Sequence, residues 1–90
     1  PDEVSKLLGI TAGGQIIFTW NNPTDSDFKL VRIKVYSGAP TYTTLYRTVE
    51  VSKPSQTATI TGLSGTLRFV VHTVDITGNQ SDGIERYYSF

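Results

Sequence analysis

Apolar and polar residues alternate with a period of two along several short segments of the chain. In the segment 15–20, Ile16, Phe18 and Trp20 fall on one face, and the polar or smaller residues between them fall on the other. This is the pattern of a strand with one buried face. Segments rich in Gly, Pro, Asn and Asp interrupt the alternation at regular intervals and read as turns. The pattern predicts seven strands, over residues 4–10, 15–20, 28–36, 42–51, 57–61, 67–75 and 84–90.

The composition favours strands over helices. Thr, Val, Ile, Tyr and Phe are abundant, whereas alanine occurs only at Ala12, Ala39 and Ala58. Residues that are branched at Cβ or aromatic suit a pleated sheet and lose rotamer freedom in a helix. Seven short strands separated by turns are typical of an all-β sandwich of two sheets, with Greek-key connections expected. The fourth strand is long and polar, as an edge strand is, and the pattern leaves open which sheet it joins.

The alternation also predicts the core. The sixth strand should turn Leu67, Phe69, Val71 and Thr73 inward, while Val70 and Val74 suggest that its other face is partly covered. The residues expected at the centre of the core are Ile16, Phe18, Trp20, Val31, Ile33, Ile60, Leu63, Phe69 and Val71.

Charge and length limit the classes of function. Eight basic and eight acidic residues give a net charge of zero, so no field attracts nucleic acid or an anionic membrane. Without cysteine there is no disulfide, thiol nucleophile or thiolate metal site, and no apolar run is long enough to span a membrane. Ninety residues predict a single domain over 1–90, monomeric in isolation. Because it begins at Pro1 and lacks methionine, we expect it to be excised from a larger multidomain protein.

Three features resemble the fibronectin type III family over nearly the whole chain. Trp20 ends the second strand and is followed by Asn-Asn-Pro, Leu63 precedes the sixth strand, and residues 71–81 read VHTVDITGNQS, similar to many bacterial members. The resemblance implies a seven-stranded immunoglobulin-like sandwich. It further implies a module of bacterial secreted or cell-surface proteins, often carbohydrate-associated, and so an extracellular or cell-surface location. The chain departs from the family at Leu67, where a tyrosine corner would place a hydroxyl.

No constellation for catalysis is recognisable. His72 is the only histidine, and it falls in the middle of a strand, where an exposed or partly covered structural side chain is the simpler reading. A general base needs a nucleophile or substrate and an orienting carboxylate, which the pattern does not supply. We expect no enzymatic activity and no cofactor.

Acidic residues occur in two loops that should lie at the same end of the sandwich. Asp25 and Asp27 follow the second strand, and Asp75 and Asp82 flank the turn after the sixth. Their oxygens could converge on Ca²⁺, which takes six to eight oxygen ligands. The alternative is that these residues occur here because Asp stabilises turns.

Exposed tyrosines are the other candidate for binding. Tyr36, Tyr42 and Tyr46 lie on or beside the third and fourth strands, and such side chains stack on sugars or anchor protein contacts. The alternative is that they fill sheet edges. Tyr87 and Tyr88 must point to opposite faces of one strand, so at least one of them should be in the core.

Two hypotheses for function follow. The first is a non-catalytic spacer and presentation module, whose partners are the flanking domains of a secreted or cell-surface protein. The second is a module that binds a glycan or a protein through Tyr36, Tyr42 and Tyr46 or through the loops around Asp25 and Asp75.

Overall fold

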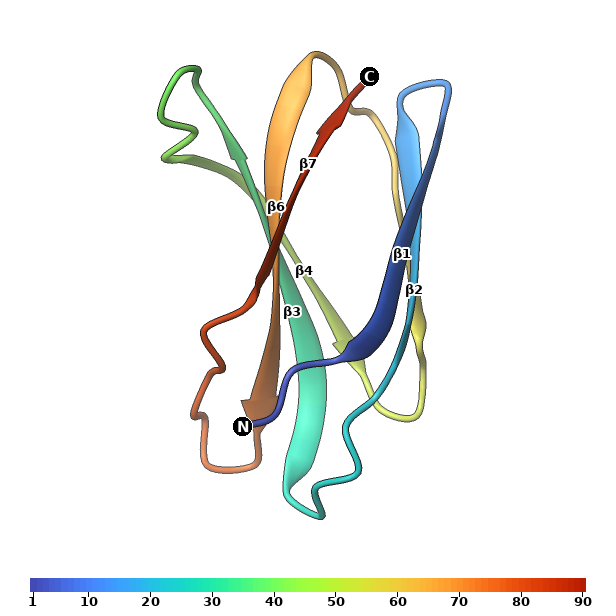
Figure 1. Ribbon diagram of the computed structural model, residues 1–90, viewed down its shortest axis with the longest axis vertical. Helices are drawn as coiled ribbons and strands as arrows, with labels where there is room; N and C mark the ends of the chain where they lie inside the picture. The colour runs from blue at the N-terminus through green and yellow to red at the C-terminus, as the bar shows by residue number, and fades with distance from the viewer.

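Seven strands form two antiparallel sheets that pack face to face in a sandwich. The computed structural model describes residues 1–90 (Figure 1). The strands are β1 (Ser5–Ala12), β2 (Gln15–Asn21), β3 (Phe28–Ser37), β4 (Thr44–Ser52), β5 (Thr57–Ile60), β6 (Thr66–Asp75) and β7 (Ile84–Ser89). The prediction of an all-β sandwich is therefore confirmed. No helix able to cross a membrane is present.

One sheet has three strands in the order β1-β2-β5, and the other has four in the order β4-β3-β6-β7. The fourth strand pairs with β3 and forms an edge of the larger sheet, which answers the question that the sequence pattern left open. The chain passes between the sheets after β2, after β4 and after β5. Strand limits differ slightly from the prediction, because β1 extends to Ala12 and β4 begins only at Thr44.

The β1–β2 hairpin shows how local sequence determines the register. Ala12 pairs with Gln15, which leaves Gly13 and Gly14 as a two-residue turn. Both glycines have positive φ, at 56° and 78°. Two-residue hairpin turns of this kind need positive φ at both positions, and glycine adopts it without steric cost.

The core lies between the sheets and is centred on aromatic rings. Phe18 from β2 and Phe69 from β6 meet edge to face, with ring centroids 5.5 Å apart, and Tyr88 packs against both. Gly9 makes room for Tyr88, because a Cβ at Gly9 would lie 2.5 Å from the tyrosine hydroxyl oxygen. All nine residues expected in the core from the sequence are buried.

The molecule is elongated, with principal extents of 37 × 24 × 18 Å. The N-terminus lies toward the end that carries the β2–β3 and β6–β7 loops, and the C-terminus lies toward the opposite end (Figure 1). Phe90 packs its ring against Phe69, 6.0 Å between centroids, so the last residue rests on the chain's own core.

Candidate functional site

Four side chains from four neighbouring strands form a row across the outer face of the larger sheet. Tyr36 on β3 pairs with Leu45 on β4 and with Arg68 on β6, and Arg68 pairs in turn with Tyr87 on β7. Directly paired residues of an antiparallel sheet point to the same face. Leu45 and Tyr87 are 54% and 50% exposed, so both ends of the row reach solvent.

Arg68 is fixed at the middle of this row. Its Nε donates to Glu85 Oε2 at 2.7 Å, its Nη1 donates to the Tyr42 carbonyl at 3.3 Å, and its guanidinium carbon lies 4.8 Å from the Tyr36 ring centroid. The hydrogen bond with Glu85 raises the pKa of Arg68, and partial burial offsets some of this rise. The guanidinium is therefore held over the Tyr36 ring by a cation–π contact and by an ion pair with Glu85.

Tyr42 completes the group from the β3–β4 loop. Its ring meets Tyr87 edge to face at 5.4 Å between centroids, and its backbone N donates to the Gly38 carbonyl at 2.8 Å. Tyr42 has φ of 50°, an uncommon conformation for a bulky residue. The loop thus holds a strained tyrosine in place over the row. We call Tyr36, Tyr42, Leu45, Arg68, Glu85 and Tyr87 the tyrosine patch.

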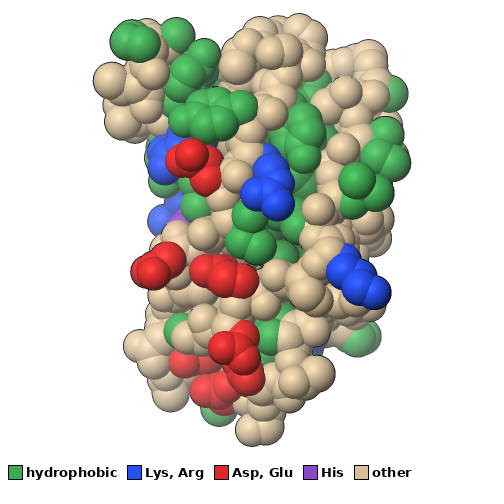
Figure 2. All heavy atoms as spheres, viewed as in Figure 1, with side chains coloured by type: hydrophobic (Ala, Val, Ile, Leu, Met, Phe, Trp, Pro, Cys, Tyr) green, Lys and Arg blue, Asp and Glu red, His purple; other side chains and the backbone are tan.

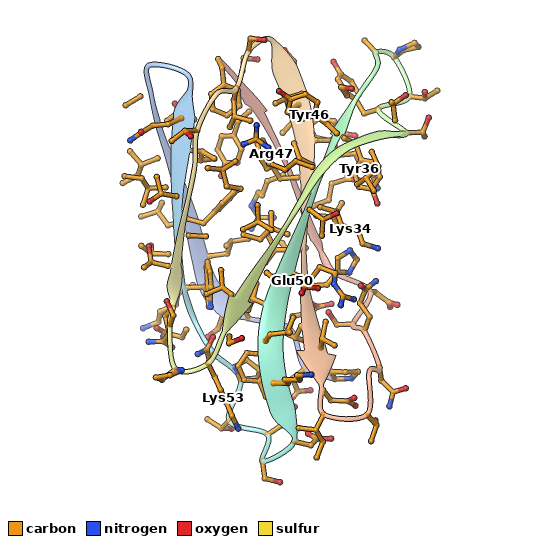
Figure 3. All side chains as sticks on the ribbon, turned by 180° about the vertical axis from the view of Figure 1, so that it is seen from behind. Lys34, Tyr36, Tyr46, Arg47, Glu50 and Lys53 are labelled. Carbon is orange, nitrogen blue, oxygen red and sulfur yellow. The ribbon has the colours of Figure 1, made fainter.

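Tyr46 lies apart from the other two tyrosines singled out in the sequence. The pairing of β3 with β4 shifts between Val35 and Tyr36, and Tyr46 is the extra residue of this bulge. A bulge redirects the side chain that it displaces. The Tyr46 hydroxyl donates to the Gly62 carbonyl at 3.3 Å, and Arg47 Nη1 donates to the Thr61 carbonyl at 2.6 Å. Both side chains point toward the smaller sheet, away from Tyr36 and Lys34 (Figure 3).

Of the six residues of the tyrosine patch, only Tyr36 and Tyr42 were among the binding candidates chosen from the sequence. Leu45, Arg68 and Glu85 belong to strands that were predicted, but their proximity to Tyr36 depends on the order β4-β3-β6-β7. Tyr87 was expected to face away from Tyr88, and it does, since Tyr88 packs into the core while Tyr87 is half exposed. The one signal in the sequence was the alternation along each strand, which places each of these residues on the outer face of the sheet.

The two acidic loops lie at the same end of the molecule. The backbone N of Ile76 donates to the Asp27 carbonyl at 2.9 Å, and acidic side chains gather over this end (Figure 2). The four candidate ligands do not come together, however, because no group of three or more His, Asp or Glu side chains is arranged to hold a metal ion. Asp82 is exposed, and Asp25 Oδ2 accepts from the backbone N of Asp2 at 3.3 Å.

Asp75 instead organises the turn that follows β6. Its Oδ1 accepts from the backbone N and hydroxyl of Thr77 and from the backbone N of Asn79, and its Oδ2 accepts from Asn79 Nδ2. Desolvation by burial would raise the pKa of Asp75, but the hydrogen bonds from Thr77 and Asn79 outweigh it and lower the pKa to about 2. The carboxylate is thus committed to holding its own loop.

His72 is buried, at 7% exposure, rather than exposed or partly covered as expected. Residues 79–83 fold back over the outer face of β6, and His72 Nδ1 lies 2.9 Å from the Ser81 carbonyl oxygen. A Cβ at Gly83 would lie 2.6 Å from Val70 Cγ1 and 2.8 Å from His72 Nδ1, so only glycine allows this close cover. The apolar side chains of Val70 and Val74 indicated that this face of β6 is partly covered, but the alternation did not identify residues 79–83 as the covering segment.

Glu3 fastens the covering segment and was not anticipated from the sequence. Its Oε1 accepts from the Ser81 hydroxyl at 2.7 Å, and its Oε2 accepts from the Gly83 backbone N at 2.8 Å. Ser81 Oγ also accepts from the backbone N of Thr73, whose hydroxyl donates to the Asp2 carbonyl. Glu3 is therefore tied to the β6–β7 loop, and Asp2 is tied to β6. No pocket indents the surface of the molecule.

Comparison with known proteins finds a structural likeness but no related sequence. No family model matches the chain, and no curated protein matches its sequence. Among solved structures, the chain is similar to part of the spore cortex lytic enzyme SleM of Clostridium perfringens, with 16% identity and a TM-score of 0.74. The match covers 100% of this chain and 28% of the SleM chain. The likeness establishes a small all-β domain with a structural counterpart inside a longer protein.

Proposed function

We propose that this chain is a fibronectin type III-like module without catalytic activity, which fixes the distance and direction between its neighbours in a secreted or cell-surface protein. The strand order carries the proposal. In a constant-type immunoglobulin domain the fourth strand joins the sheet of the first two, whereas here β4 pairs with β3. A three-plus-four sandwich with this edge strand and its Greek-key crossings fits the fibronectin type III arrangement.

The positions of the termini support a role as a spacer. The ends of the chain lie toward opposite ends of a body 37 Å long, and each is anchored (Figure 1). At one end Glu3 is bonded to Ser81 and Gly83, and Val4 is buried in the core. At the other end the backbone N of Phe90 donates to the Gly65 carbonyl at 2.9 Å. Anchored ends transmit the orientation of one neighbour to the next.

His72, Asp75, Glu50 and Glu85 could serve in acid–base chemistry, but each makes a structural contact. His72 is buried against Ser81, and both oxygens of Asp75 accept hydrogen bonds within its turn. Glu50 is paired with Arg32 and Glu85 with Arg68, each at 2.7 Å. The structural neighbour supports the modular reading, since a domain of this shape occupies 28% of a spore cortex lytic enzyme. Because a shared fold does not imply a shared activity, the absence of catalysis is tested below with a turnover assay.

Spin labels test whether the ends are fixed. The chain has no cysteine, so Pro1→Cys with Ser89→Cys gives two unique attachment sites. Pulsed dipolar spectroscopy should give one narrow distance distribution, because Glu3 and Val4 are anchored near one label and the other label is on β7. A broad distribution would show that the domain does not set the geometry of its neighbours.

A turnover assay tests the absence of catalysis. Purified spore cortex peptidoglycan, incubated with the 90-residue chain, should release no more reducing ends or muropeptides than a buffer control. Release that is lost in His72→Ala and Asp75→Asn variants that remain folded would overturn the non-catalytic assignment.

A further inference from the structure

The tyrosine patch is an organised surface that the spacer role does not use. It spans all four strands of the larger sheet, which is about 15 Å at the usual spacing of 4.7–4.9 Å between strands. Tyr36, Leu45, Arg68 and Tyr87 form its row, and Tyr42 stands over the Tyr87 end. None of these side chains is needed to complete the core, which lies on the other face of the sheet.

The patch is held rigid before any ligand arrives. Arg68 is restrained by Glu85, by the Tyr42 carbonyl and by the Tyr36 ring, and Tyr42 is restrained by its loop and by Tyr87. Surfaces fixed in advance lose little conformational entropy on binding. The strained φ of Tyr42 agrees with this, because strain of this kind collects at functional positions.

The charges of the patch favour a neutral ligand. Arg68 and Glu85 neutralise each other at 2.7 Å, so the patch presents no net charge of its own. The hydroxyls of Tyr36, Tyr42 and Tyr87 and the Nη2 of Arg68 make no hydrogen bond within the chain, whereas Arg68 Nε and Nη1 are both used. Apolar ring area beside unused hydroxyls and one free guanidinium nitrogen suits a molecule with apolar faces and hydroxyl edges. Saccharides have that chemistry.

The shape of the site favours an extended ligand over a small molecule. Sites for small molecules are concave, whereas the surface here has no pocket. A protein partner needs roughly 800 Å² and 20–30 residues on each side. The patch has six side chains, and the ion pair of Arg32 with Glu50 lies on the same face beyond Lys34. A narrow polymer fits this strip better than a second protein.

We infer that the tyrosine patch binds a neutral polysaccharide that lies across β4, β3, β6 and β7. The sugar rings contact Tyr87, Tyr42 and Leu45, and the free nitrogen of Arg68 donates to their hydroxyls. This surface differs from the set of Tyr36, Tyr42 and Tyr46 suggested by the sequence, because Tyr46 lies outside it. It is independent of the proposed spacer role, whose failure in the spin-label test leaves this binding unaffected.

A matched pair of tyrosine variants provides the test. Tyr87 and Tyr46 are 50% and 47% exposed, but only Tyr87 belongs to the patch. A glycan array with neutral and anionic members, followed by titration of the best neutral hit, is measured for the parent, Tyr87→Ala and Tyr46→Ala. We expect neutral glycan binding that weakens by roughly tenfold in Tyr87→Ala, as for loss of one well-placed aromatic contact, and is unchanged in Tyr46→Ala. Thermal melts check that both variants fold, and Leu45→Asp at the other end of the row gives a second disruption.

The remaining outcomes overturn the inference. Failure to bind any neutral glycan removes its basis. Equal losses in Tyr87→Ala and Tyr46→Ala place the sugar elsewhere. Binding restricted to anionic glycans and lost in Lys34→Gln assigns the surface to charge rather than to the tyrosines. Binding of a protein that Leu45→Asp abolishes, without any glycan binding, identifies a protein interface instead.

Discussion

The outer face of the four-stranded sheet has two halves, and the outward-facing side chains are buried in one half and exposed in the other. In the half toward the N-terminal end, Val70, His72 and Val74 point outward and yet are buried beneath residues 79–83. We call this the covered half. In the other half, Leu45 and Tyr87 also point outward and remain about half exposed in the tyrosine patch. One half is closed by the chain itself, and the other is open to a partner.

The difference lies in the loops and not in the strands. The β6–β7 loop folds back on β6 because Gly83 lacks a side chain and because Glu3 holds its backbone and Ser81. The β3–β4 loop instead projects from the sheet and supplies Tyr42 (Figure 1). Outward-facing residues of one sheet therefore become a second small core or a presented surface, depending on which loop covers them.

The largest loss of stability is expected from a substitution that disrupts the close packing of the covered half. Gly83→Ala adds a Cβ within 3 Å of Val70 and His72 at a position with φ of 95°. Overpacking and backbone strain together should lower the free energy of unfolding by about 2–4 kcal/mol, measured by chemical denaturation.

Gly78→Ala is the matched control for Gly83→Ala. Gly78 has nearly the same φ, 90°, but a Cβ there meets nothing within 4 Å. Strain alone should cost about 1 kcal/mol. Equal losses in the two variants would mean that the cover is loosely packed.

A smaller loss of stability is expected when the hydrogen bonds from residues 79–83 to Glu3 are weakened. Glu3→Gln keeps the length of the side chain but turns an amide nitrogen toward one of two donors, Ser81 Oγ or Gly83 N. We expect a loss of about 1–2 kcal/mol, since a hydrogen bond to a charged group is broken. Glu85→Gln in the open half breaks an exposed ion pair and should cost no more than about 0.5 kcal/mol. A larger loss of unfolding free energy in Glu85→Gln than in Glu3→Gln, measured by chemical denaturation, would contradict the contrast between the halves.

Acid should weaken the end of the molecule that holds the cover. Asp75 has its pKa lowered to about 2 from an ordinary 3.8, so its charged form stabilises the fold above pH 4. That contribution is lost as the pH falls from about 4 to 2, where the folded protein begins to bind the proton. Melting temperatures should fall over this range in the parent and fall less steeply in Asp75→Asn. Identical slopes would remove Asp75 from the acid response.

The smallest effect belongs to the open half. Leu45→Thr replaces an exposed apolar side chain with one that suits a strand, so stability should change by less than about 0.5 kcal/mol. Val70→Thr places a hydroxyl beneath Gly83 in the covered half and should cost at least about 1 kcal/mol. Thermal denaturation of the two variants side by side compares the halves with the same introduced residue.

The strands of this domain are predictable from its sequence, but the contacts between distant strands are not. Period-two alternation places Phe18 and Phe69 inside without reference to any other part of the chain. The burial of His72 could not be obtained in this way, because it depends on Gly83 and on Glu3, which lies 80 residues before Gly83 in the chain. The tyrosine patch likewise required the order of the strands and the bulge that separates Tyr46 from Tyr36.

Native-state hydrogen exchange tests the contrast between the halves most directly. The amide of Gly83 donates to Glu3, and the amide of Ser81 donates to the Thr73 carbonyl, whereas that of Phe90 donates to Gly65 at the opposite end. In the parent, all three should exchange slowly. Glu3→Gln should speed exchange at Gly83 and Ser81 by about tenfold, the equivalent of about 1.4 kcal/mol, and leave Phe90 unchanged. Unprotected Gly83 and Ser81 amides in the parent, or an equal acceleration at all three, would contradict a cover that Glu3 fastens locally.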